Sequence, residues 1–489
     1  MLDRLLTSLD ELLRPYLPAP GSPSLPINVL YLGLLPLSLL LFSPPIKSMF
    51  RSTFYSTLSA LRLTSRPHLV MNDKPAVLSR IDRETGKEVR TSLREVVERC
   101  RSLGEWYTPT FWLASGHLAT IYCTIADFSY DSCTYSRRLL QLPDGGSISL
   151  DFTPPITPED PIDSRPILVA LHGLTGGSHE SYVIDVLSKI TKERDEKNLE
   201  GQGLGWRAVV VNFRGGAYTD DLRCALSYLS HLAPKAPLYG VGFSLGANVL
   251  AKYLGEEGDK TPLKAGVVLG APWDFYAGHV YLSRSWLSTI YSKAMAKNLR
   301  GVVSRNRAAL EGAVDFDCMY GNPQQTLYEF DSVGTRVIAG YTSVEAYYKD
   351  ASANQHAHNI SVPTLSLSSS DDPIIPASSV PFSAALANPN LIIGTTLHGG
   401  HLGWFTGFFR PRRWISRPVI EFLREMERAD PVARKHLETV PQQREGKVPS
   451  IGDDMVVVRG GEDVGFRETA VGVVESGGSV EDAGLTRGL

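Results

Sequence analysis

The chain has 489 residues, of which 43% are hydrophobic and 21% charged, a composition typical of a globular protein with a sizeable core. Its formal net charge of -3 gives no basic field for a phosphate backbone, so nucleic-acid binding is excluded as a leading function. The five cysteines contain no Cys-X-X-Cys pair, which specifies neither a disulfide framework nor a zinc site and fits a reducing compartment. We expect neither a metal nor a cofactor.

The N-terminal region, residues 1–75, contains an uncharged apolar segment at 27–42. The segment is shorter than the roughly 18 to 20 residues that usually span a bilayer, and Pro36 interrupts it. Acidic residues near the start, Asp3 and Asp10 among them, argue against a cleaved signal peptide. We therefore expect a membrane anchor or monotopic insertion, with a buried core helix as the alternative.

Basic residues are more frequent after this apolar segment than before it. The positive-inside rule then leaves the large C-terminal part of the chain in the cytosol. The expected location is a membrane surface, and both the endoplasmic reticulum and lipid droplets fit. The basic residues after the segment are Lys47, Arg51, Arg62 and Arg66, and those before it are Arg4 and Arg14.

Beyond a polar, arginine-rich stretch near 75–105, short apolar runs alternate with helical segments. Two of the runs flank Asp144-Gly145-Gly146, a turn sequence that predicts a β-hairpin. Strands alternating with helices predict an α/β fold, with a mostly parallel sheet covered by helices on both faces. The predicted strands are 137–142, 147–152, 167–171, 208–211, 238–241, 265–269, 364–367 and 391–393, and the clearest helices are 182–189 and 220–232.

Two further segments depart from this rhythm. Residues 274–362 lie between the sixth and seventh core strands and have little strand signal, so we expect a lid insertion, or helices that only widen the core. Residues 430–489 are rich in Gly, Val, Glu and Asp without periodicity, and they predict an acidic, disordered tail.

The sequence Gly242-Phe243-Ser244-Leu245-Gly246 stands between a predicted strand and a predicted helix. On a sharp strand-to-helix turn, the neighbours of a nucleophilic serine must be small so that its oxygen stands clear of the sheet. The motif occurs by chance in many chains, so its interpretation depends on partners elsewhere. A serine nucleophile needs a base, a carboxylate that orients the base, and donors for the oxyanion.

The acid candidates are Asp371 and Asp372, on the loop after the strand at 364–367. The usual position, four residues before the second proline of this loop, selects Asp372. Asp371 is then a turn residue or a helper. Two alternatives stay open: the two aspartates could exchange these roles, or both could be solvated turn residues.

The base candidates are His398 and His401, on the loop after the strand at 391–393. His401 follows two glycines that free the backbone to bend, so we favour it over His398. The remaining alternative is that both histidines only pack or hydrogen-bond within the loop.

The oxyanion donors are expected at the backbone N–H groups of Leu174 and Leu245. Leu174 lies in the loop that begins His172-Gly173, after the strand at 167–171. A phosphate-binding loop is disfavoured because no Lys-Ser or Lys-Thr pair follows. Other histidines are expected to pack in loops rather than to bind metal, namely His172, His179, His356 and His358.

With these residues in place, the chain resembles the α/β-hydrolase family that contains the yeast medium-chain fatty acid ethyl ester synthases/esterases and related animal and bacterial esterases. The resemblance covers about residues 105–425, the expected catalytic domain. Ala119 and Gly216 depart from the family pattern, where relatives often have Gln and Cys. The specific marks are Ser115-Gly116-His117-Leu118-Ala119-Thr120, Asn212-Phe213-Arg214-Gly215-Gly216, Gly242 to Asn248, Asp371-Asp372-Pro373 and Gly399-Gly400-His401.

The resemblance implies that Ser244 is the nucleophile, Asp372 the acid and His401 the base of an acyl-enzyme mechanism. The acyl donor would be an acyl ester or acyl-CoA of medium chain length, and the acceptor water or an alcohol. Two other functions stay open: a lipase or phospholipase of membrane glycerolipids, and a non-catalytic interaction protein on the same fold.

Overall fold

The computed structural model describes residues 64–81, 87–126, 132–156, 164–193, 203–407, 409–429, 456–457 and 465–475. The apolar segment at 27–42 lies outside these residues. Within the described ranges, no helix is both long and apolar enough to cross a membrane. Eleven strands of the described chain form one sheet in the order β1-β11-β10-β9-β8-β6-β7-β5-β4-β15-β14.

The centre of the sheet is parallel, from β7 to β11, which confirms the predicted α/β fold. All residues of β6, β8 and β10 are buried, and the largely apolar sequences of β6 and β8 are typical of strands that helices cover on both faces. The parallel strands are β6 (Ile167–Leu171), β7 (Arg207–Asn212), β8 (Leu238–Phe243), β9 (Leu263–Leu269), β10 (Thr364–Ser369) and β11 (Leu391–Thr396).

Antiparallel strands extend the sheet at both edges. On one side the predicted hairpin forms as β4 (Thr134–Gln141) and β5 (Ser147–Thr153), and β5 pairs with β7. On the other side β1 (His68–Val70) pairs with β11, so part of the predicted N-terminal region 1–75 belongs to the main sheet.

The prediction of a disordered tail at 430–489 is wrong for the residues that form β14 and β15. β15 (Gly465–Glu475) pairs antiparallel with β4, and β14 (Val456–Val457) pairs with β15. Phe466 is buried, with its ring edge-on to Tyr228 at 5.1 Å, and the buried Glu468 accepts a hydrogen bond from the Tyr228 hydroxyl at 2.8 Å. Composition alone missed this strand because the open edge of β4 supplies its backbone partners.

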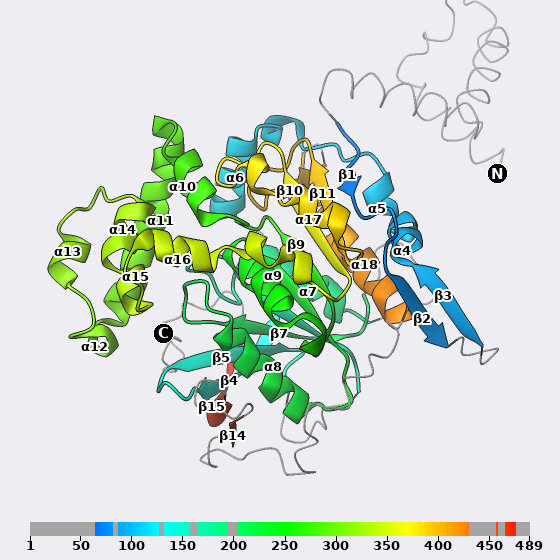
Figure 1. Ribbon diagram of the computed structural model, residues 1–489, viewed down its shortest axis with the longest axis horizontal. Helices are drawn as coiled ribbons and strands as arrows, with labels where there is room; N and C mark the ends of the chain where they lie inside the picture. Colours follow the sequence, from blue (N-terminus) through cyan, green and yellow to red (C-terminus); the bar gives the residue numbers. More distant parts are fainter. Residues whose placement is uncertain are drawn as a thin grey trace, which may run out of the picture. The chain divides into compact units, whose positions relative to one another are not determined.

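Helices cover both faces of the sheet (Figure 1). Side chains alternate along β6, so Leu168 and Ala170 join one core while Val169 and Leu171 join the other. The first core is covered by α7 (Ser181–Thr191) and α18 (Ser416–Arg428), and the second by α8 (Asp220–Leu232) and α9 (Leu245–Glu257).

In the arginine-rich stretch near 75–105, the two helices pack against α18. It is followed by a short helix and α6, which carry the residues 115–120 singled out above. The elements are β2 (Val77–Ile81), β3 (Glu88–Ser92), α4 (Leu93–Arg99), α5 (Arg101–Gly104), η2 (Phe111–Leu113) and α6 (Gly116–Ile125). Smaller elements later in the chain are η3 (Gly258–Lys260), η6 (Ala377–Ser379), α17 (Phe382–Ala387), β12 (Phe405–Thr406) and β13 (Arg412–Arg413).

The insertion between the sixth and seventh core strands, β9 and β10, is helical and gathers at one side of the sheet (Figure 1). It has a small core of its own, which includes Met319 and Phe330. We call this insertion the helical cap. Its helices are α10 (Phe275–Leu282), α11 (Trp286–Arg305), α12 (Arg307–Leu310), α13 (Phe316–Tyr320), α14 (Leu327–Val333), α15 (Thr335–Ile338), α16 (Val344–Ala351), η4 (Ala353–Gln355) and η5 (Ala357–Asn359).

A buried carboxyl group, Asp331, lies between helices of the cap. It accepts hydrogen bonds from the Thr335 hydroxyl and from the Tyr348 hydroxyl, the latter at 2.8 Å. Burial outweighs these hydrogen bonds and raises the pKa of Asp331 to about 6. The folded protein therefore holds this proton more tightly than the unfolded chain, in which an aspartate titrates near pH ~3.9.

Because of this raised pKa, Asp331 should make the protein less stable as the pH rises from about 4 to 6, and the loss should persist above pH 6. Urea unfolding at pH 5 and pH 7 measures the effect. Relative to the wild type, Asp331→Asn should reduce the difference in unfolding free energy between the two pH values by about 1–3 kcal/mol. The exposed Asp317→Asn is the matched control and should change nothing; equal pH dependence in all three proteins would contradict the assignment.

Candidate active site

The turn from β8 into α9 holds Ser244 in a left-handed conformation, with φ 52° and ψ -118°. A Cβ on Gly242 would lie 2.4 Å from the carbonyl oxygen of Gly246, and one on Gly246 would lie 2.4 Å from the carbonyl oxygens of Leu171 and His172. Both positions therefore exclude any side chain. The turn is the strained nucleophile elbow that the sequence predicts.

The structure brings together the three side chains predicted as nucleophile, base and acid. Ser244 Oγ lies 2.8 Å from His401 Nε2, and His401 Nδ1 lies 2.8 Å from Asp372 Oδ2. The other oxygen of Asp372 accepts the backbone N–H groups of Ile374 and Ile375 at 2.8 and 2.9 Å. With Nδ1 protonated, Nε2 of His401 is free to take the serine proton.

The structure separates the two neighbouring aspartates. Asp371 Oδ1 accepts the N–H of Gly400 at 2.9 Å, the residue before His401, and Asp371 Oδ2 lies 3.5 Å from His398 Nδ1. Asp371 thus fixes the histidine loop, while Asp372 contacts the imidazole of His401. Neither Asp371 nor His398 reaches Ser244 in the contacts of the described residues.

The loop after β6 lies against the nucleophile, because a Cβ on Gly173 would lie 3.3 Å from the Cβ of Ser244. The N–H of Gly173 donates to the Tyr182 hydroxyl at 3.0 Å, and the next N–H, that of Leu174, is the predicted oxyanion donor. Leu245 is the first residue of α9, so its N–H has no acceptor within the helix. The two predicted donors therefore flank Ser244.

Sequence reasoning did not foresee the role of α6 beneath the histidine loop. Thr120 Oγ1 accepts the backbone N–H of His401 at 2.8 Å and donates to the carbonyl of Gly116 at 2.7 Å. A Cβ on Gly116 would lie 1.8 Å from the carbonyl oxygen of Asp371. The family motif at 115–120 was the signal, and its spacing of four residues places Gly116 and Thr120 on one helical face.

The motif at 212–216 also has a structural role. The Asn212 side chain accepts the N–H of Ser178 at 3.1 Å and donates to Asp151 at 2.8 Å, which ties the oxyanion loop to the sheet. Arg214 forms an ion pair with Asp221 at 2.7 Å and a second with Asp144. The motif therefore holds the wall of the neighbouring cavity.

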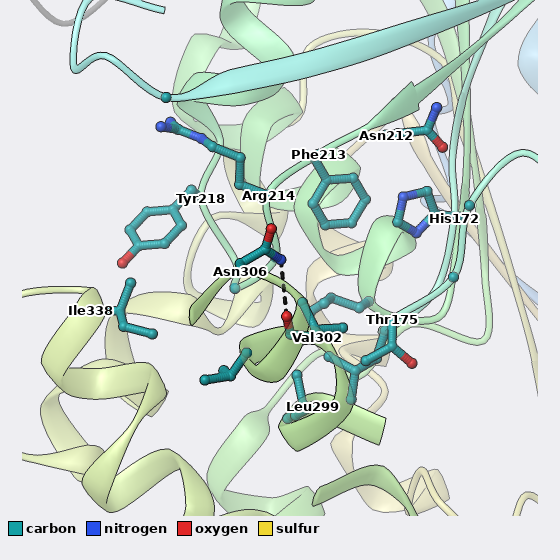
Figure 2. A pocket seen from close by; sticks show the side chains of 18 of the residues that line it. His172, Thr175, Asn212, Phe213, Arg214, Tyr218, Leu299, Val302, Asn306 and Ile338 are labelled. Carbon is teal, nitrogen blue, oxygen red and sulfur yellow. Dashed lines mark hydrogen bonds between the residues drawn. The ribbon is translucent and has the colours of Figure 1, made fainter. Parts of the chain in front are cut away.

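A cavity of about 1200 Å³ lies between these loops and the helical cap. Leu174 and Leu245 line it beside the nucleophile, although Ser244 itself does not. Figure 2 shows Leu299 and Val302 of α11 facing His172 and Phe213 across this space. The cavity exceeds the roughly 300–1,000 Å³ of typical small-molecule pockets. The predicted lid insertion therefore supplies one wall of a large cavity next to Ser244.

His172 is buried in this wall, and burial lowers its pKa to about 4. Its ring stacks on Phe213 with centroids 4.6 Å apart, and Nδ1 lies 2.8 Å from the carbonyl of Gly173. His172 is therefore a neutral packing residue at neutral pH. Among the described residues, no three His, Cys, Asp or Glu side chains gather as they would around a metal, and His179 and His358 are exposed.

The family described as serine aminopeptidase, S33, matches residues 199–390. Monoacylglycerol lipase of Saccharomyces cerevisiae is 28% identical over 403 residues, 73% of this chain and 89% of that protein. Phospholipase ABHD3 of Homo sapiens is 30% identical over 351 residues, 68% of this chain and 82% of that protein. Medium-chain fatty acid ethyl ester synthase/esterase 2 of S. cerevisiae is 32% identical over 295 residues, 54% of this chain and 62% of that protein.

The elbow serine, the hydrogen-bonded histidine and aspartate, and the parallel sheet together define a serine hydrolase. The chain belongs to the α/β-hydrolase family, among its serine esterases and lipases. This confirms the predicted resemblance at the level of the family and of an ester-hydrolysing enzyme.

The two aspartates should differ in their effect on turnover. Asp372→Asn removes the carboxylate that holds His401 Nδ1–H and should lower kcat about 10³- to 10⁴-fold. Asp371→Asn weakens one hydrogen bond to the histidine loop and should cost about tenfold. Steady-state hydrolysis of a water-soluble short-chain ester checks both, and a larger loss for Asp371→Asn would reverse the assignment.

Proposed function

We propose that this protein hydrolyses and transfers fatty acyl groups through an acyl-enzyme on Ser244. The observation that carries the proposal is the continuous row from Ser244 Oγ through the His401 imidazole to Asp372, with 2.8 Å at each contact. A serine hydroxyl becomes a competent nucleophile only when a base in this position takes its proton.

In the first half-reaction, Ser244 Oγ attacks the acyl carbonyl while its proton moves to His401 Nε2. The negative charge on the carbonyl oxygen is stabilised by the N–H groups of Leu174 and Leu245. The tetrahedral intermediate collapses, and His401 protonates the leaving alcohol or thiol. In the second half-reaction, His401 takes a proton from water or an alcohol, which attacks the acyl-enzyme carbonyl. The bond to Ser244 Oγ then breaks, His401 returns the proton to Ser244 Oγ, and an acid or a new ester is released.

The cavity supports an acyl chain as the group held beside Ser244. Most cap residues that line it are apolar, beside Arg305, Asn306 and Thr335, so an acyl chain buried against the apolar ones leaves water without losing hydrogen bonds. A medium-length chain with ethanol or water as acceptor is the first candidate, as the family resemblance implies. The apolar wall consists of Leu299, Val302, Val303, Phe330, Ile338 and Ala339.

A glycerolipid ester is the second candidate substrate. Two of the relatives that align along most of their length are named as a monoacylglycerol lipase and a phospholipase, and part of the cavity lining is polar. Arg214 and Asp144 lie there as an ion pair that offers donors and acceptors to a glycerol headgroup.

Removal of the nucleophile tests the mechanism itself. Ser244→Ala should abolish covalent labelling by a fluorophosphonate probe and lower ester hydrolysis at least about 10⁴-fold. The exposed Ser283→Ala serves as the control and should label like the wild type. Undiminished labelling of Ser244→Ala would contradict the mechanism, and an unlabelled wild type would favour a non-catalytic interaction protein.

An acyl-chain series with competing acceptors tests the substrate class. Medium-chain esters should give the highest kcat/KM, and ethanol should divert part of the acyl product into ethyl ester, because both acceptors attack the same acyl-enzyme. Product chromatography measures the partition. A higher kcat/KM for monoacylglycerol, with no ethyl ester formed, would favour the glycerolipid candidate instead.

A further inference from the structure

Helix α6 buries its small residues and exposes its large apolar ones. Gly116, Ala119 and Thr120 face the protein, where they support the loops of the catalytic acid and base. Leu118, Ile121 and Ile125 are exposed, and Ile125 is 74% accessible. A surface helix of a soluble protein has the opposite polarity, so the outer side of α6 is built for an apolar environment.

The first two helices of the cap show the same inversion. α10 exposes Tyr276 and Val280 at a spacing of four residues. α11 buries Ser288 and Ser292 while it exposes Ile290 and Trp286, and the Trp286 side chain is 77% accessible. Two neighbouring helices thus present large apolar side chains to solvent at helical spacing.

These helices form one continuous surface. The His117 ring of α6 stacks on Tyr291 of α11 at 5.7 Å and is hydrogen-bonded to its hydroxyl at 3.0 Å, and α11 in turn contacts α10. Trp112 of η2 packs edge-on against Tyr122 of α6 at 5.1 Å. We call the exposed apolar residues of η2, α6, α10 and the start of α11 the apolar face.

The apolar face carries no formal charge. η2, α6, α10 and α11 as far as Ser292 contain no Asp, Glu, Lys or Arg. Exposed basic residues stand next to it. Arg284 lies between α10 and α11, and Arg410 and Arg412 follow the exposed Phe409 in the β12–β13 hairpin, where Gly407 accepts a hydrogen bond from the residue before η2. An uncharged apolar centre with aromatic residues and a basic rim matches the interface of a phospholipid bilayer.

The apolar face also connects to the reaction site. Tyr281 of α10 donates to the carbonyl of Asp372 at 3.2 Å, so α10 touches the acid loop on its inner side. α11 has 20 residues, about 30 Å, and runs from Trp286 on the apolar face to Leu299 and Val302 on the cavity wall. The apolar face is therefore joined both to the acid loop, through α10, and to the cavity wall, through α11.

The chain enters the described structure beside the same face. Thr64, the first described residue, donates to the carbonyl of Tyr107 at 2.6 Å and lies 2.9 Å from the Thr108 hydroxyl. Thr108 is three residues before Phe111, the first residue of the apolar face. The described part of the chain therefore begins beside η2.

We propose that the apolar face docks on the surface of a phospholipid bilayer, so that the enzyme takes an acyl lipid directly from the membrane. The delivery of a lipid ester rests on the proposed function, whereas the docking itself does not. The bilayer is favoured over a protein partner because the face is uncharged and is basic at its rim. Docking orients the cap and the acid loop toward the lipid.

Trp286 reports on docking without any assay of activity. The full-length protein is mixed with phosphatidylcholine vesicles that carry brominated or unmodified acyl chains, and tryptophan fluorescence is recorded for the wild type and Trp286→Phe. Bromine should quench the wild type more than Trp286→Phe, because Trp286 enters the acyl region. Equal quenching of both proteins would overturn the proposal, and it is the result expected if residues 27–42 or a second copy of the chain covers the face.

Activity supplies a second, independent readout. Ile125→Glu/Ile290→Glu should retain the wild-type rate on a water-soluble ester but lose at least about tenfold on a lipid ester held in vesicles, because charges resist burial in the bilayer. Val77→Glu/Leu386→Glu changes two equally exposed apolar residues elsewhere and should keep both rates. An unchanged vesicle rate for Ile125→Glu/Ile290→Glu, or a dimer that this variant dissociates, would overturn docking. If the wild type is inactive on all esters, the proposed function is refuted. The quenching experiment then still decides whether the apolar face docks on a bilayer.

Discussion

The positive φ of Ser244 is the constraint on which the site depends. A left-handed conformation costs a residue with a side chain about 1–3 kcal/mol, so the surroundings must hold it in place. The N–H of Ser244 donates to Leu269 on β9, and Asn248, one turn into α9, binds Ala351 and Ala353 through its side chain at 2.7 and 3.0 Å. The elbow is thus held both by the sheet and by the last helices of the cap, just before the chain re-enters the sheet at β10.

The reacting groups come from separate strand ends that the parallel sheet brings to one edge. β8 leads to Ser244, β10 to Asp372 and β11 to His401, while β6 leads to the oxyanion loop. In a parallel sheet the carboxyl ends meet at the same edge, so residues far apart in the chain can lie within hydrogen-bond distance. Thr120 on α6, outside the sheet, then holds the histidine loop by accepting a hydrogen bond from the backbone N–H of His401.

The sequence was sufficient where the signal is local. The elbow glycines, the strands and the order of serine, acid and base follow from short patterns, because each depends on neighbours within a few residues. The choice between Asp371 and Asp372 rested on spacing alone, since only the fold shows which carboxylate meets the imidazole. The contact of Thr120 with His401 and the pairing of β15 with β4 join segments hundreds of residues apart, and no local pattern encodes such partners.

The pairing of β15 with β4 has a consequence for synthesis of the chain. Arg138 on β4 and Glu468 on β15 are separated by 330 residues, which a ribosome translates in roughly 15–70 s at ~5–20 residues per second. Throughout that interval the side of β4 that faces away from β5 is an open sheet edge, the kind of surface that recruits other chains. An open edge of this kind is a place where aggregation can begin during synthesis, and β15 covers it only after the segments that carry Ser244, Asp372 and His401 have been translated.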